Sequence, residues 1–305
     1  MLEPSRVSIS AIMNTFLRAY HSRHDDPKIF DDFLAYPFLT EEEYTFLHKG
    51  MAQALGFFDP ELAAGCPDEA SATRLGLRVQ TGPVVLSRAH YTEEKLKAAV
   101  KQGVKQYVIL GAGIDTFAFR EPELVNRLQV FEVDHPLTQT FKRERIVRRG
   151  WELPPQLHFV PMDFTKDSLS EALVQAGYDP HAPSFYSWQG VTYYLTRDVI
   201  FDTLRTIAAI APAGSALIFD YIDPDAFNPE RSSRIMQRTI EIVQNIGEPM
   251  KTVFDPATLA ADLAPAGWQL QENLSPADIE ARYFAGRTDG FHAFPHFHYA
   301  DAVVA

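Results

Sequence analysis

Residues 107–120 read Tyr-Val-Ile-Leu-Gly-Ala-Gly-Ile-Asp-Thr-Phe-Ala-Phe-Arg, and they carry the strongest local signal in the sequence. A short β-rich run leads straight into Gly111 and Gly113, as happens where a buried strand turns sharply into a helix. Glycine at these positions lets the backbone pass close to a ligand, because no Cβ stands in the way. A tight turn also favours glycine for steric reasons alone, so a second signal is needed to indicate a ligand.

That second signal is an acidic residue at the end of the next predicted strand. Residues 129–133 form this strand candidate, and Asp134 follows it directly, about 20 residues beyond the glycines. A carboxylate at this place accepts hydrogen bonds from both hydroxyls of a ribose. The glycine turn and Asp134 together predict a nucleoside-containing ligand.

The residues after the glycines indicate which nucleoside is bound. A dinucleotide fold needs a third glycine for close helix packing, but Thr116 occupies that position. Asp115 places a negative charge where a pyrophosphate lies against a helix N-terminus. This charge repels the phosphates of NAD, whereas S-adenosylmethionine (SAM) is a sulfonium without phosphate. SAM is therefore the favoured cofactor, and an NAD(P)-dependent oxidoreductase is the disfavoured alternative.

Further strand and helix signals alternate along the chain. Residues 106–110, 158–160, 184–188 and 216–222 are β-rich runs, and the helix predicted after Thr196 has an amphipathic pattern. Strands separated by helix-length segments imply right-handed βαβ units and a parallel sheet covered on both faces. The predicted fold class is a doubly wound α/β domain.

Two flanking zones surround this core in what we expect to be a single domain, residues 1–305. Residues 1–85 are helix-like, with a capping-box spacing at Thr40 and Glu43. Within them, residues 65–82 carry Gly, Pro, Ser and Thr and are predicted to be a loop. The core spans residues 86–222.

The third zone, residues 223–305, begins with a polar, helix-like insert. Residues 255–266 are predicted as a helix and residues 268–273 as a strand. The aromatic run 290–299 is predicted as an edge strand.

Composition excludes several classes of function. The net charge of −12 argues against nucleic-acid binding, and the basic run 142–149 is interpreted as a solvated helix face. A single cysteine, Cys66, excludes an internal disulfide framework and fits a reducing compartment. No stretch is long and apolar enough to span a membrane, so a cytoplasmic location is expected.

Three motifs carry a resemblance to a known family. Residues 111–116, 131–136 and 190–195 resemble the leucine carboxyl methyltransferase family, and more closely its bacterial members that methylate small molecules. The resemblance extends from about residue 18 to residue 222. It implies a class I SAM-methyltransferase core, Rossmann-like, with an N-terminal helical extension and a late insert that forms a lid.

The resemblance also implies roles for particular residues. Arg88 holds the methionine carboxylate of SAM, Gly111 and Gly113 lie against the ligand, and Asp134 binds the ribose. Asp163 and Phe164 contact the adenine. From the residues alone, a surface ion pair is the favoured interpretation of Arg88, and Asp163 is equally compatible with a cap of the helix after it.

Other positions are candidates for the substrate pocket. Tyr194 and Gln189 follow the fourth strand at the carboxyl edge, and Arg18 lies in the first lid helix. Gln189 is also a candidate contact to SAM, although family members that methylate a C-terminal leucine usually have Glu there. Many relatives have Arg at the position of Phe117. These departures argue against a protein phosphatase tail as the substrate.

The histidines at positions 292, 296 and 298 raise the question of a metal. Their spacing places them on one face of a strand. The interleaved aromatic residues favour packing on the sheet instead, and no metal site is predicted.

The predicted reaction is methylation of a small molecule at oxygen, most simply at a carboxylate. A carboxylate is ionised at neutral pH and needs no general base. A hydroxyl acceptor needs a base, for which His21 and His90 are candidates. A SAM-binding protein without turnover is the non-enzymatic alternative.

Overall fold

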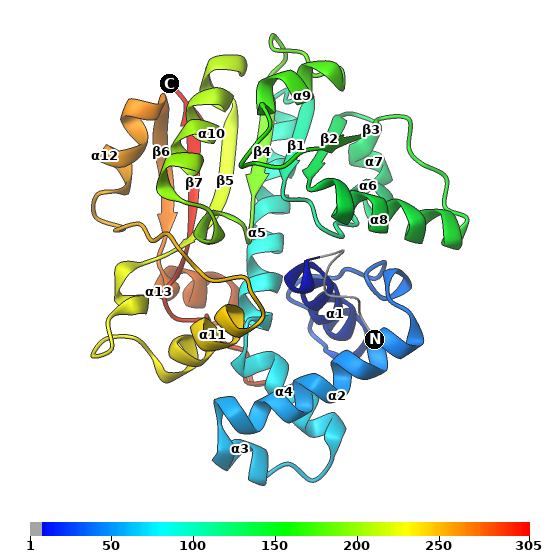
Figure 1. The fold of residues 1–305 in the computed structure, drawn as a ribbon, viewed down its shortest axis with the longest axis vertical. Helices are drawn as coiled ribbons and strands as arrows, with labels where there is room; N and C mark the ends of the chain where they lie inside the picture. The colour runs from blue at the N-terminus through cyan, green and yellow to red at the C-terminus, as the bar shows by residue number, and fades with distance from the viewer. Residues whose placement is uncertain (1–7) are drawn as a thin grey trace.

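The computed structural model describes residues 8–305 and is built on one seven-stranded sheet of order β3-β2-β1-β4-β5-β7-β6 (Figure 1). The first five strands in this order are parallel, and β7 runs antiparallel to both β5 and β6. The strands are β1 Gln106–Leu110, β2 Gln129–Asp134, β3 Leu157–Pro161, β4 Ser184–Trp188, β5 Ala216–Ile222, β6 Trp268–Leu274 and β7 Phe297–Val304.

Helices cover both faces of this sheet, as expected for a doubly wound fold. Two large apolar clusters, one on each face, join the sheet to these helices. One face packs against α5 (Gly82–Lys101), α6 (Phe117–Arg120), α7 (Pro122–Val125), α8 (Pro136–Arg149) and α13 (Pro276–Ile279). The other packs against α9 (Leu169–Gln175), α10 (Arg197–Ile210) and α12 (Leu259–Leu263). The predicted class I methyltransferase fold is confirmed.

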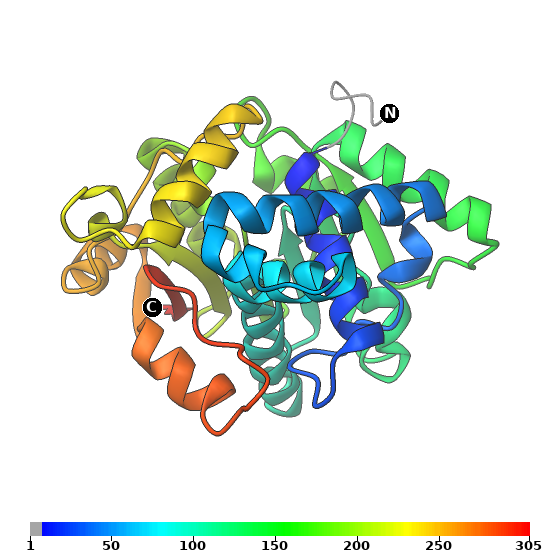
Figure 2. The ribbon, with the colours of Figure 1, turned by 90° about the horizontal axis from the view of Figure 1, so that it is seen from below.

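The remaining helices gather beyond the carboxyl ends of the parallel strands (Figures 1 and 2). They are α1 (Ile9–His24), α2 (Glu41–Phe58), α3 (Pro60–Ala64), α4 (Glu69–Val79) and α11 (Arg234–Asn245). Thr40 and Glu43 form the predicted capping box at the start of α2. No helix within residues 8–305 has the length and apolar character needed to cross a membrane.

The prediction of a loop over residues 65–82 is wrong, because α4 lies within it. Asp68 caps this helix by accepting a hydrogen bond from the amide of Ser71 at 2.7 Å. Leu77 is fully buried, and α4 packs along α2. The cap and this burial outweigh the weak helix propensity of the Gly, Ser and Thr residues.

Two predictions near the C-terminus also need correction. Residues 290–299 do not form an edge strand: β7 begins later and lies inside the sheet. The backbone of His296 has a φ of 70°, which lies outside the β region, so the strand begins only after this residue. The helix predicted over residues 255–266 is reduced to α12; residues 256–258 form a turn before it, and Pro265 lies in a 3-10 turn that follows it.

The basic run 142–149 is not simply a solvated helix face. Lys142 is fully buried, and its ammonium lies 2.5 Å from a carboxylate oxygen of Glu132. Arg145 pairs with Glu43 at 2.6 Å, which ties α8 to the N-terminal helices. Burial raises the pKa of Glu132 to about 7, although the neighbouring ammonium acts in the opposite direction. The basic run therefore attaches α8 to β2 through Lys142 and to α2 through Arg145.

We expect Lys142→Met to lower the free energy of unfolding by about 3–5 kcal/mol, because Glu132 then remains buried without its counter-ion. Urea denaturation measures this change. The double variant Lys142→Met/Glu132→Leu should recover most of the loss, since it removes both charges. If Lys142→Met unfolds at the wild-type urea concentration, the buried pair has no such role.

Candidate functional site

A cavity of about 460 Å³ opens at the carboxyl ends of β1, β2 and β4. Strand order reverses between β1 and β4, and ligands of open α/β sheets bind at such a point. Its volume lies in the range of small-molecule sites. Every residue predicted to bind the cofactor or to line the substrate pocket contributes to its lining: Arg18, Arg88, Gly111, Gly113, Asp134, Asp163, Phe164, Gln189 and Tyr194.

The glycine turn forms the floor of the cavity. Gly111 has a φ of +73°, and a Cβ there would lie 2.3 Å from a methyl carbon of Val191. Gly113 has a φ of +55°, and a Cβ on it would lie 3.4 Å from the Cβ of Ala11 in α1. Only glycine suits the conformation and the space at position 111. The turn is thus enclosed between the β4 edge and α1.

Asp134 lines the cavity next to this turn. One of its carboxylate oxygens accepts a hydrogen bond from the amide of Gly113 at 2.5 Å, and the other from the amide of His135 at 2.6 Å. Burial raises the pKa of Asp134, and these two amides partly offset that effect. Each carboxylate oxygen keeps a further lone pair that can accept a hydrogen bond from a ribose hydroxyl.

Arg88 is only 6% exposed, so the alternative of a surface ion pair is wrong. Its Nη1 lies 2.7 Å from a carboxylate oxygen of Asp220 and 3.2 Å from the hydroxyl of Tyr193. Burial opposes the charged form, but Asp220 outweighs it and the pKa of Arg88 is raised. A Cβ on Gly190 would lie 2.6 Å from Nη2. Any side chain at position 190 would therefore clash with this guanidinium, which lies at the cavity wall.

Asp163 orders the turn that follows β3. Its carboxylate accepts hydrogen bonds from the amide and the hydroxyl of Thr165 at 3.0 and 2.7 Å and pairs with Lys166 at 2.7 Å. The bonds from Lys166 and Thr165 lower the pKa of Asp163 well below its usual range. Ser168, not Asp163, caps the helix that follows. The alternative role as a helix cap is therefore wrong.

Aromatic residues after β3 and β4 divide between core and cavity. Phe164 lines the cavity and stacks on Trp188, with 5.9 Å between ring centroids. Tyr193 is buried and packs against Phe297, so it belongs to the core. Tyr194 lines the cavity, and burial raises the pKa of its hydroxyl to about 12.

Gln189 joins the cavity wall to α5. Its amide nitrogen donates to the backbone carbonyl of Arg88 at 2.8 Å and to the hydroxyl of Thr92. These bonds fix the side chain beside Arg88. The amide oxygen remains the atom that can face a ligand.

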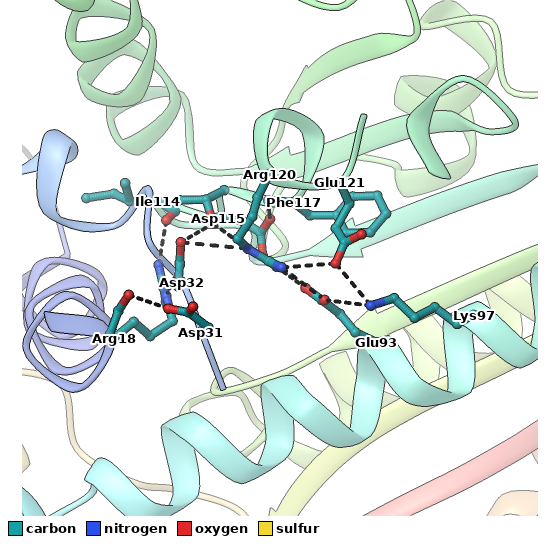
Figure 3. Close-up of polar contacts among 12 residues, drawn as sticks. Arg18, Asp31, Asp32, Glu93, Lys97, Ile114, Asp115, Phe117, Arg120 and Glu121 are labelled. Carbon is teal, nitrogen blue, oxygen red and sulfur yellow. Dashed lines mark hydrogen bonds and ion pairs between the residues drawn. The ribbon is translucent and has the colours of Figure 1, made fainter. Parts of the chain in front are cut away.

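A polar network lies on the α1 side of the cavity (Figure 3). Arg18 donates from Nε to Asp32 at 2.8 Å and from Nη2 to the carbonyl of Ile114 at 2.7 Å. Arg120 pairs with Glu93. Burial raises the pKa of Glu93 to about 7.

Residues from two distant segments close the cavity. Ser8 and Ser10, at the start of α1, donate hydrogen bonds to the carboxylate of Glu248, which follows α11. The amide of Lys251 donates to the carbonyl of Tyr193 at 2.6 Å and holds this segment at the cavity edge. Sequence reasoning missed these residues, because isolated Ser, Glu and Lys in loops carry no motif.

Neither histidine considered as a general base lines the cavity. His21 is buried, with Nδ1 2.8 Å from Asp25 and Nε2 accepting from the amide of Ile29. His90 lies 2.6 Å from the carbonyl of Ile29 through Nδ1. Both act in packing the loop after α1.

The three C-terminal histidines do not converge. His296 and His298 each hydrogen-bond to a different carboxylate oxygen of Asp223, at 3.0 and 3.1 Å. His292 pairs with Glu280 at the surface. Within residues 8–305 no group of His, Cys, Asp or Glu side chains is arranged to hold a metal.

Comparisons with known proteins agree with this geometry. A model of the leucine carboxyl methyltransferase family matches residues 11–208. "Putative S-adenosyl-L-methionine-dependent methyltransferase YktD" of Bacillus subtilis is 40% identical over 297 residues, which cover 97% of each chain. "Putative S-adenosyl-L-methionine-dependent methyltransferase FRAAL3718" of Frankia alni is 32% identical and covers 71% of this chain and 69% of its own.

A solved structure shares the fold at low sequence identity. The DUF574 family protein from Streptomyces avermitilis superposes with a TM-score of 0.59 at 14% identity, and the match covers 100% of both chains. The family match gives no support to the oxidoreductase alternative. The chain belongs to the leucine carboxyl methyltransferase family, as its three motifs predicted.

Proposed function

We propose that this protein is a SAM-dependent methyltransferase that methylates a small organic acid at its carboxylate. The observation that carries the proposal is the single cavity on which all the predicted ligand-binding residues converge. SAM binds there with its methionine carboxylate on Arg88, its ribose on Asp134 and its adenine beside Asp163 and Phe164.

The charges around the cavity suit a cationic cofactor. Its lining holds six carboxylates (Asp32, Glu93, Asp115, Asp134, Asp163 and Glu248) and four cations (Arg18, Arg88, Arg120 and Lys251). Asp115 lies in the glycine turn itself, where its carboxylate accepts from the amide of Phe117 at 2.7 Å. A pyrophosphate in this turn would meet a fixed negative charge, whereas a sulfonium is attracted to it.

When bound, SAM supplies a methyl group that is already activated on sulfur. The chain contributes position and a water-poor enclosure. The glycine turn lets SAM approach the backbone closely. Arg88 binds the methionine carboxylate of SAM, and Asp134 binds its ribose. We propose that α1 and the segment after α11 form the lid, because Glu248 joins them through Ser8 at 3.0 Å and through Ser10.

The acceptor side of the cavity supports an acid. Three of its four cations have an acidic partner: Arg18 with Asp32, Arg88 with Asp220 and Arg120 with Glu93. Lys251 also lines the cavity and makes no ion pair within the described part of the chain, residues 8–305, and we propose that it binds an anionic acceptor. Tyr194 and the Nη1 of Arg18 offer further donors. A carboxylate needs no proton removed before it attacks.

This proposal predicts a methyl ester as product and a rate that is independent of pH in the alkaline range. We expect mild alkali to return the product to the free acid, because esters hydrolyse and methyl ethers do not. The initial rate should stay within about two-fold between roughly pH 7.5 and 9, since the acceptor is already ionised. Mass spectrometry of products from a panel of organic acids, with formation of S-adenosylhomocysteine as the readout, makes this test.

Glu93→Gln is the matched control for the pH profile. It removes a cavity carboxyl whose pKa is raised to about 7, and it should leave the alkaline profile flat. A product that survives alkali, or a rate that climbs steeply with pH in both proteins, would establish a hydroxyl acceptor. Tight SAM binding without turnover on any acid or alcohol would support the non-catalytic alternative.

A further inference from the structure

Thr116, which replaces the third glycine of a dinucleotide turn, makes a specific buried contact. Its hydroxyl donates to a carboxylate oxygen of Asp32 at 2.7 Å. Thr116 is 2% exposed and Asp32 is 1% exposed, so water does not compete for this bond. Asp32 lies in the loop after α1, far from the turn in sequence. A residue of the N-terminal extension thus holds the end of the glycine turn.

The other oxygen of Asp32 binds the lid helix. It accepts from Nε of Arg18 at 2.8 Å, and the same guanidinium donates through Nη2 to the carbonyl of Ile114 at 2.7 Å. Nε of Arg120 lies 3.7 Å from Asp32 and adds a second positive charge. Figure 3 shows the two arginines on either side of Asp32, beneath the turn. The turn is therefore fixed at Ile114 and Thr116 by groups that Asp32 orients.

Packing reinforces this connection. Ala11 of α1 lies over Gly113, close to where a Cβ at that position would stand. The position of α1 and the shape of the turn are consequently linked by three hydrogen bonds and by the lack of space between Ala11 and Gly113 for any larger side chain. A buried carboxylate between two arginines is costly to neutralise, because both cations then lose a counter-ion.

We infer that Asp32 is a positioning residue that couples docking of α1 to the cofactor-binding geometry of residues 111–116. It acts through Arg18 and Thr116. This inference rests on the proposed function, in which SAM binds at that turn. It predicts that ordering of the lid helix and binding of SAM favour each other.

Two pairs of variants test the coupling through SAM affinity, measured by calorimetric titration. Thr116→Val removes the hydroxyl without changing the shape of the side chain, and Thr116→Ser keeps the hydroxyl. We expect Thr116→Val and Asp32→Asn to bind SAM about ten-fold more weakly or worse, and Thr116→Ser to bind nearly as wild type. Asp31→Asn is the matched control, because Asp31 is exposed and contacts Ser22 on the outer side of α1. It should bind SAM as wild type does.

Hydrogen exchange of the amides of residues 9–24 provides a readout that a purely structural role would not change. In the wild type, SAM should slow exchange in this helix as well as in the turn. In Thr116→Val, any remaining SAM binding should protect the turn only. The double variant Asp32→Asn/Thr116→Val should lose no more affinity than the weaker-binding single variant, because both act on one path.

Unchanged SAM affinity in Thr116→Val, additive losses in the double variant, or full SAM-dependent protection of α1 in Thr116→Val would each overturn the coupling. If the wild-type protein itself does not bind SAM, the proposed function fails, and that outcome is distinct from failure of the coupling.

Discussion

Asp134→Ala should weaken binding of S-adenosylhomocysteine at least about 100-fold. The variant loses two charge-assisted hydrogen bonds to the ribose, each worth about 1.5–3 kcal/mol, and a factor of ten corresponds to about 1.4 kcal/mol. It also frees the amides of Gly113 and His135, so the turn loses a support. Calorimetric titration of the wild-type and variant proteins measures the change.

A modified ligand separates the ribose contact from the support of the turn. The 2′-deoxy form of S-adenosylhomocysteine lacks one of the two hydroxyls and should bind more weakly to the wild type. Asp134→Ala should no longer distinguish the two ligands, because the carboxylate that reads the hydroxyl is gone. If the variant still prefers the ribose form as strongly as the wild type does, Asp134 does not bind the ribose.

Arg88→Ala should have two large effects. Binding of SAM should fall by at least about ten-fold, because the charge-assisted bonds to the methionine carboxylate are lost. The free energy of unfolding should fall by about 3–5 kcal/mol, because Asp220 is then buried without its cation. Arg88→Lys should restore only part of the affinity, since an ammonium cannot reproduce a bidentate guanidinium.

The double variant Arg88→Ala/Asp220→Asn separates folding from binding. It removes the unpaired buried charge, and Asn can still accept from the amide of Gly190, which now donates to Asp220 at 2.7 Å. Urea denaturation should show stability recovered, while calorimetry shows affinity still lost. Recovery of SAM affinity together with stability would mean that Arg88 serves the fold alone.

The sequence predicted the parts of the site that follow from periodicity and turn chemistry. The strand leading into Gly111, and Asp134 at the end of the next strand, are local patterns whose consequences in a parallel sheet are general. Both lie on one cavity. Likewise, the order of strands and helices was enough to predict the doubly wound fold.

The parts that sequence missed depend on contacts between distant segments. Glu248 meets Ser8 across 240 residues, and no local pattern marks either one. The Gly, Pro, Ser and Thr residues of positions 65–82 suggested a loop, but α4 forms there and packs on α2. Lys142 lies in a basic run that the sequence predicts to be exposed, yet its ion pair with Glu132 on a neighbouring strand allows it to be buried. Tertiary partners decide all three, and they are not visible in a single sequence.

We propose that the cavity at the carboxyl edge of β1, β2 and β4 binds the adenosyl cofactor. A crystal structure of the protein with S-adenosylhomocysteine tests it most directly. We expect density in this cavity, with both ribose hydroxyls within hydrogen-bond distance of Asp134 and the terminal carboxylate on Arg88. Density for the ligand at another place, or a cavity that stays empty at a concentration that saturates binding in solution, would contradict it.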